Sequence, residues 1–154
     1  MASQLLSELF AVVARIAAQT VSAAATASSD VIDMANFHEV VFLVNIGDYA
    51  AGNDGSLACS VYYDTASGGS FANVVTGKTL TVATFTGSTG DNQHGVIHVR
   101  AEELVTEDAD ARYIRLKATP TNEDLLLGAV ALGRPRYQPG KNFDLSAVHR
   151  IPLS

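Results

Sequence analysis

The sequence is poor in cysteine, tryptophan and charged residues. Its 154 residues include one cysteine and no tryptophan, and only 17% of them are charged. The single Cys59 excludes an internal disulfide, and its place in an apolar run predicts a small buried side chain. Because about 25% charged residues is usual for a globular domain, this chain is expected to bury part of its outer surface against partners.

Long apolar runs are also missing. No stretch approaches the ~18 consecutive uncharged apolar residues of a membrane helix, so we expect no membrane partner. Residues 5–18 could be mistaken for a signal peptide, but Glu8 and Arg15 interrupt them and no basic region precedes them. The chain is therefore expected to be cytosolic at synthesis. With 47% hydrophobic residues it is too apolar to be disordered, and its length is that of one domain.

The net charge of −6 is distributed unevenly. Residues 1–110 carry three basic and thirteen acidic side chains, which gives −10, whereas residues 111–154 carry seven and three, which gives +4. The acidic body argues against nucleic acid as a partner, because nucleic-acid binding depends on neutralising phosphates. The basic C-terminal part suits an acidic protein surface; the alternative is that the difference in sign is incidental.

The apolar pattern changes from helical to β-like along the chain. Residues 3–13 have the apolar spacing of a short amphipathic helix or an N-terminal arm. A continuous apolar run at 39–45 predicts a central strand that is covered on both faces. Further strands are expected at residues 57–64, 79–86, 96–100, 112–119 and 125–132, and residues 101–104 suggest one helical turn.

Glycine, asparagine and aspartate fill the connections between these runs, as is typical of turns in antiparallel sheets. About seven or eight strands connected in this way predict an all-β fold, an antiparallel jelly-roll-like β-sandwich. Three segments are expected: a short N-terminal helix or arm over residues 1–16, the β-sandwich domain over 17–133, and an extended C-terminal arm over 134–154 that contains three prolines.

No catalytic motif is supported by its context. Residues 77–79 (Gly-Lys-Thr) match the end of a phosphate-binding loop, but position 72 is alanine where that motif needs glycine. His94 and His98 are four residues apart, but the residues between them indicate a turn that enters a strand, and no third metal ligand is evident. The acidic loop at 48–54 has oxygen ligands that suit calcium, yet it also reads as an ordinary turn. We therefore predict no catalytic, cofactor-binding or metal-binding residue, and no enzyme.

Five segments, in their order along the chain, resemble those of a known family. They are residues 4–8 (Gln-Leu-Leu-Ser-Glu), 32–37 (Ile-Asp-Met-Ala-Asn-Phe), 42–47 (Phe-Leu-Val-Asn-Ile-Gly), 111–116 (Ala-Arg-Tyr-Ile-Arg-Leu) and 132–139 (Leu-Gly-Arg-Pro-Arg-Tyr-Gln-Pro). Together they resemble the head decoration, or cement, proteins of tailed bacteriophages. The resemblance implies a jelly-roll-like β-sandwich that assembles, often as trimers, on the outer surface of the capsid. There it would bridge neighbouring major capsid proteins, without catalysis or a cofactor.

Large side chains near the two ends of the chain are the candidate contacts with the major capsid protein or with further copies of this chain. They are Leu5, Leu6, Leu9 and Phe10 in the N-terminal segment and Arg134, Arg136, Tyr137, Lys141 and Phe143 in the C-terminal arm. Arginine and tyrosine are favoured interface anchors. The alternatives are that the first set packs on the protein's own sandwich and that the second is a solvated tail.

A second function class remains open, a carbohydrate- or receptor-binding β-sandwich of a phage tail or fibre. Residues 111–116 also resemble a strand of galactose-binding-like domains. The aromatic residues could supply stacking surfaces, or they could belong to the core. These residues are Tyr62, Tyr63, Phe71, Tyr113 and Tyr137. The absence of tryptophan weakens this alternative, because carbohydrate-binding modules commonly stack sugars on indole rings.

Overall fold

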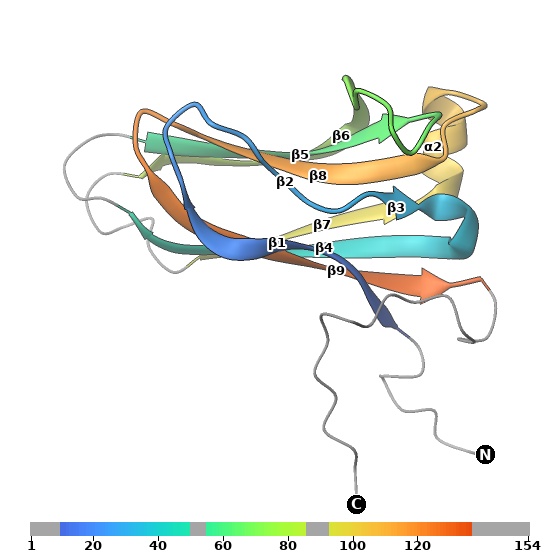
Figure 1. The fold of residues 1–154 in the computed structure, drawn as a ribbon, viewed down its shortest axis with the longest axis horizontal. Helices are drawn as coiled ribbons and strands as arrows, with labels where there is room; N and C mark the ends of the chain where they lie inside the picture. Colours follow the sequence, from blue (N-terminus) through green and yellow to red (C-terminus); the bar gives the residue numbers. More distant parts are fainter. Residues whose placement is uncertain (1–9, 50–54, 86–92, 137–154) are drawn as a thin grey trace, which may run out of the picture.

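Two antiparallel β-sheets pack face to face in the computed structural model, which describes residues 10–49, 55–85 and 93–136 (Figure 1). The four-stranded sheet has the order β1 (Ala11–Val21), β9 (Leu125–Pro135), β4 (Phe37–Tyr49), β7 (Gln93–Arg100). The five-stranded sheet has the order β2 (Ala27–Ser28), β8 (Tyr113–Thr121), β5 (Gly55–Asp64), β6 (Asn73–Phe85), and β3 (Ile32–Asp33) also pairs with β8. The predicted all-β, antiparallel β-sandwich is confirmed.

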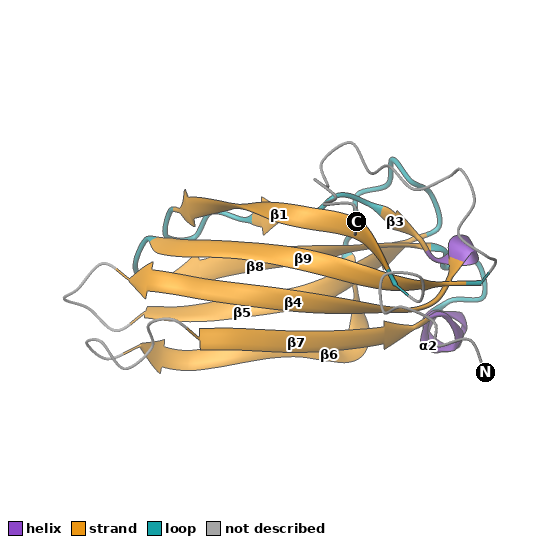
Figure 2. Cartoon of the chain, turned by 90° about the horizontal axis from the view of Figure 1, so that it is seen from below, coloured by secondary structure: helices purple, strands orange, loops and turns teal. Residues whose placement is uncertain are grey.

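Consecutive strands mostly belong to opposite sheets. Among the strands of the described residues, only β2 and β3, and then β5 and β6, follow each other within one sheet. Such crossing between the two layers is compatible with the jelly-roll-like arrangement that the sequence predicts. Within the described part of the chain, two short helices lie at one end of the sandwich: η1 (Met34–Asn36) precedes β4, and α2 (Ala101–Glu107) follows β7 (Figure 2). The helical turn expected at residues 101–104 is therefore confirmed as the first half of α2.

The core lies between the sheets and follows from the alternation of the strands. On β5, Leu57, Cys59 and Val61 are fully buried, as their spacing predicts, and on β8 the same is true of Ile114 and Leu116. Burial raises the pKa of the Cys59 thiol to about 12, so at neutral pH the group is an uncharged hydrophobic side chain. The prediction that Cys59 is a buried structural residue is confirmed.

Strand β4 differs from its prediction, because only one of its faces is covered. Val40, Phe42 and Val44 face the core, with exposed fractions of 0 to 1%, whereas Leu43 is 37% exposed on the opposite face. The continuous apolar run had indicated cover on both faces. In the structure the second sheet packs against one side of β4 alone, and the described residues place no element over its other side.

The expected boundaries of both arms also shift. Residues 11–16, assigned to an N-terminal helix or arm over 1–16, belong to strand β1 and pair with β9 at residues 129–133. Arg134 and Pro135, assigned to a C-terminal arm over 134–154, complete strand β9. The physical reason in both cases is backbone hydrogen bonding. Residues 11–16 form a ladder with β9, and Arg134 and Pro135 continue the ladder between β9 and β4. The remaining parts of the predicted arms, 1–9 and 137–154, lie outside the described residues.

A buried serine closes the gap between β2 and β3. Ser29 is 2% exposed, its Oγ accepts a hydrogen bond from the Leu116 backbone N–H (3.0 Å), and its hydroxyl donates to the Asp30 carbonyl (2.8 Å). The Ser29 hydroxyl thus takes the place of a backbone carbonyl as the acceptor for the Leu116 N–H on β8.

Ser29→Ala is expected to lower the free energy of unfolding by about 1–3 kcal/mol, because the buried N–H of Leu116 would lose its acceptor. Urea unfolding measures this change. Ser28→Ala is the matched control, since the neighbouring Ser28 is exposed and should change stability by no more than about 0.5 kcal/mol. Equal effects of the two substitutions would contradict the role assigned to the Ser29 hydroxyl.

Candidate functional site

Three neighbouring strands of the four-stranded sheet carry an ordered set of side chains on the face turned away from the core, here called the outer face. In Figure 2 the four-stranded sheet lies in front, so that its outer face is turned toward the viewer. Because β9, β4 and β7 are in register, the outward side chains form rows across the strands. From the α2 end the rows are Arg134, Glu39 and Arg100; then Leu132, Val41 and His98; then Val130, Leu43 and Val96; and then Gly128, Asn45 and His94.

The two middle rows contain five aliphatic side chains, here called the apolar patch: Val41, Leu43, Val96, Val130 and Leu132. Val96 is 62% exposed and Leu43 is 37% exposed, while the other three are half-buried. Exposed aliphatic residues that occur singly are ordinary, but neighbours in register form a continuous surface. The patch is therefore a candidate interaction surface.

Polar pairs hold the edge of the patch in place. His94 Nδ1 lies 2.9 Å from Asn45 Oδ1, and His98 Nε2 lies 2.9 Å from Glu39 Oε2. Arg134 donates to the other carboxylate oxygen of Glu39 at 3.5 Å. An apolar centre with a polar, hydrogen-bonded rim is the usual anatomy of a protein–protein interface.

Acid is expected to destabilise the fold through Glu39. Burial would raise the pKa of this carboxyl, but the hydrogen bonds and charges of His98 and Arg134 outweigh burial and lower the pKa below its ordinary value of 4.5. A lowered pKa contributes stability that is present above the ordinary value and is lost as the pH falls through the folded-state pKa. Glu39→Gln should therefore cost up to about 1 kcal/mol at pH 7 and almost nothing at about pH 3.

Urea unfolding of both proteins at the two pH values tests this expectation. Glu102→Gln is a suitable control, since Glu102 is 76% exposed and its pair with Arg100 is 3.5 Å long. A cost for Glu39→Gln that is the same at both pH values would show that its interactions do not depend on the charge of the carboxylate.

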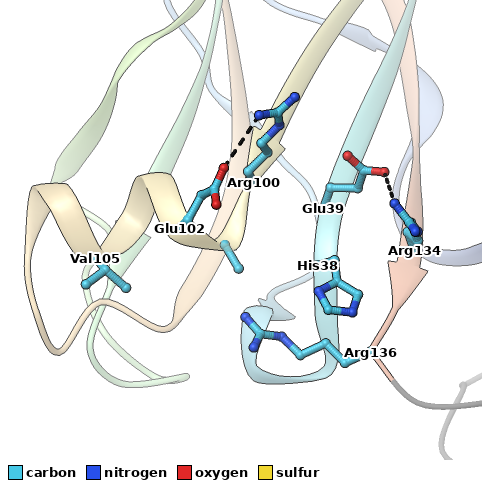
Figure 3. Close-up of a pocket in the computed structure, with 8 residues that line it drawn as sticks. His38, Glu39, Arg100, Glu102, Val105, Arg134 and Arg136 are labelled. Atoms are coloured by element: carbon cyan, nitrogen blue, oxygen red, sulfur yellow. Dashed lines mark hydrogen bonds and ion pairs between the residues drawn. The ribbon is translucent and has the colours of Figure 1, made fainter.

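A pocket of about 500 Å³ opens where the outer face meets α2. Figure 3 shows Arg100, Glu102 and Val105 on the side of α2, and His38, Glu39, Arg134 and Arg136 on the side of β4 and β9. These side chains come from three segments that are far apart in the sequence. The register of β4 with β7 and with β9 brings them together at the end of the sheet.

The predicted contact residues are only partly described. Phe10 is half-buried just before β1, Arg134 is exposed at the end of β9, and Arg136 follows that strand. The structure brings Arg134 and Arg136 to the same pocket. Leu5, Leu6, Leu9, Tyr137, Lys141 and Phe143 lie outside the described residues, so their contacts stay a prediction.

Sequence reasoning missed the apolar patch and the pocket. In the run at 39–45 inward and outward residues are both apolar, which conceals the alternation. The signal that could have revealed it is the polar character of Glu39 and Asn45, which lie on the same face as Leu43. The pocket depends on Arg100 and Glu39, whose proximity no local pattern indicates.

The aromatic residues proposed for sugar stacking are largely occupied within the protein. Tyr63 and Phe71 are buried, with exposed fractions of 8% and 1%. The Lys117 ammonium lies 4.4 Å from the centre of the Tyr62 ring, and the Arg112 guanidinium lies 5.2 Å from that of Tyr113. Tyr137 lies outside the described residues. These contacts give no support to a stacking platform for sugars.

The other candidate chemistry finds little support. Within residues 10–49, 55–85 and 93–136, no group of three metal-ligating side chains comes together. Gly77 has a positive φ of 71° within β6, and the Lys78 ammonium lies 2.8 Å from a carboxylate oxygen of Glu103 on α2. Most of the acidic loop at 48–54 is not described. No helix in the described part of the chain is long and apolar enough to cross a membrane.

Comparison with models of protein families gives no match for this chain, and comparison with curated proteins gives none.

Proposed function

We propose that this protein is a structural virion protein that binds the outer surface of a phage capsid and bridges major capsid proteins to stabilise the head. It works as a binding protein and catalyses no reaction. The resemblance of its ordered segments to head decoration proteins supports this role, as does its β-sandwich fold. The resemblance also suggests that the protein assembles as a homotrimer.

The observation that carries the proposal is the apolar patch with its hydrogen-bonded rim. Val96 and Leu43 lie opposite each other on β7 and β4, and both are exposed on an extended strand surface. A partner that covers these side chains removes apolar surface from water, and this burial stabilises the complex by about 25 cal/mol per Å². A rigid sheet face presents such a surface at little cost in conformational entropy.

Repeated binding sites on a capsid allow contacts of moderate affinity to hold the protein on the shell. A shell presents the same site many times, and a protein that contacts two shell subunits at once gains from effective concentration. Because binding to the assembled shell stabilises that state by mass action, the shell would resist disruption better with the protein than without it. This mechanical role also suits the low proportion of charged residues in the chain.

Reconstitution tests the proposal. Purified protein is mixed with capsids of the source phage that were assembled without it, and the shells are sedimented. We expect the protein to sediment with the shells and to saturate at a copy number comparable to that of the major capsid protein. Protein that stays in the supernatant at all concentrations would overturn the proposal. Binding to glycans instead of shells would favour the receptor-binding alternative.

A further inference from the structure

We propose that the pocket at the α2 end of the outer face binds a single carboxylate on an otherwise apolar segment of the capsid protein, with Arg100, Arg134 and Arg136 as its ligands. This inference rests on the proposed function and specifies the chemistry of the partner. The probe that represents the partner is a short apolar peptide with one glutamate, so the pocket can be tested without shells.

Among the residues that the structure describes, close ion pairs do not balance the positive charge in the pocket. Three arginines and two glutamates of this part of the chain line it. The ion pairs of Arg100 with Glu102 and of Arg134 with Glu39 are both 3.5 Å long, which is the far limit of a hydrogen bond. Glu39 also makes the closer contact with His98, at 2.9 Å. The guanidinium groups therefore retain donors for an incoming anion.

Arg136 differs from the other two arginines because its hydrogen bond within the described residues uses Nε and leaves both terminal nitrogens for an anion. Its Nε donates to the Phe37 carbonyl at 3.0 Å, which fixes the side chain at the edge of the pocket. Among the residues that the structure describes, no carboxylate pairs with its terminal nitrogens. A guanidinium anchored by one nitrogen and open at the other two is prepared to bind a carboxylate through two parallel hydrogen bonds.

The remaining wall indicates a peptide and disfavours a nucleic acid. Val105 on α2 is 60% exposed and offers an apolar contact on the α2 side of the pocket. Glu39 and Glu102 would repel the multiple charges of a phosphate backbone, and the chain as a whole carries a net charge of −6. A single carboxylate on an apolar segment meets the arginines with less repulsion.

The pocket is continuous with the apolar patch. Arg134 and Leu132 are successive outward residues of β9, as are Glu39 and Val41 of β4. A segment of the capsid protein that covers the apolar patch therefore extends, one row further, into the pocket. The arginines would then fix the register of the bound segment, while the patch supplies the apolar contact.

The experiment is an NMR titration of the full chain with a short blocked peptide that carries one glutamate between two leucines, with serines at its ends for solubility. We expect resonance shifts centred on the backbone amides of Arg100, Ala101 and Arg136. Arg136→Gln should weaken binding by about tenfold, because it removes charge-assisted hydrogen bonds. Arg15→Gln is the matched control, since Arg15 is exposed on β1 outside the pocket and its loss removes the same charge.

Three results would overturn the inference. They are the absence of binding, binding that Arg136→Gln and Arg15→Gln weaken equally, and binding of inorganic phosphate in the pocket as tight as that of the peptide. The same peptide with glutamine in place of its glutamate should bind about tenfold more weakly, because it lacks the carboxylate. Failure here with intact binding to shells would leave the proposed function standing. Peptide binding in the pocket without shell binding would instead remove the capsid protein as the partner.

Discussion

Phe42→Ala is expected to lower the free energy of unfolding by about 3–5 kcal/mol, the usual cost of removing a fully buried aromatic ring. Phe42 is 1% exposed on β4 and lies between Ile97 of β7 and Ala131 of β9, both of which are also buried. The loss comes from the transfer of the ring to water and from the cavity that remains. Because domains of this size are stable by about 5–15 kcal/mol, the variant should unfold at much lower urea concentrations.

The neighbouring residue provides the control for this measurement. Leu43 is next in the chain but points to the outer face and is 37% exposed. Leu43→Ala should cost about 1 kcal/mol or less, since most of its cost depends on burial. If the two substitutions lower the free energy of unfolding equally, the assignment of Phe42 to the core face and of Leu43 to the exposed face would be wrong.

Val96→Glu is expected to weaken binding to shells by about a hundredfold while leaving the isolated fold intact. Val96 is 62% exposed, so a carboxylate at this position stays in water in the free protein. In the complex the same carboxylate would be buried without a partner, which costs several kcal/mol. Sedimentation with shells measures the affinity, and urea unfolding verifies the fold.

Val74→Glu is the matched control for that experiment. Val74 is 38% exposed and lies on β6 in the five-stranded sheet, opposite Tyr62 of β5. The substitution adds the same charge at a distance from the outer face, so binding to shells should remain within about twofold of wild type. A comparable loss for both variants would show that added charge alone disrupts binding and that the apolar patch is not the contact.

The strands with clear alternation could be predicted from the sequence alone. On β7 the spacing places Ile97 and Val99 in the core, and both are buried. Strand β4 is harder to predict, because the residues on its exposed face are also apolar. The sequence therefore does not alternate between apolar and polar residues. Only the polar Glu39 and Asn45 distinguish the two faces. A local pattern shows which residues are apolar. Which of these apolar residues become buried depends on how the two sheets pack.

The N-terminal boundary failed for a different reason. The apolar positions before Val13 suit a helix as well as a strand, and the partner of residues 11–16 is β9, which is more than a hundred residues away in the chain. Local spacing contains no information on such pairing. The same limit applies to the pocket: Arg134 and Arg136 were predicted as contacts from their residue types, but only the sheet register adds Arg100.

The copy number of this chain in purified virions of its source phage, relative to the major capsid protein, tests the central claim most directly. Quantitative mass spectrometry of peptides from both proteins gives this ratio. A decoration protein that bridges capsid subunits across the head predicts copies in the hundreds, comparable to the major capsid protein. A handful of copies per particle, or none, would contradict that role and would favour a tail or fibre protein.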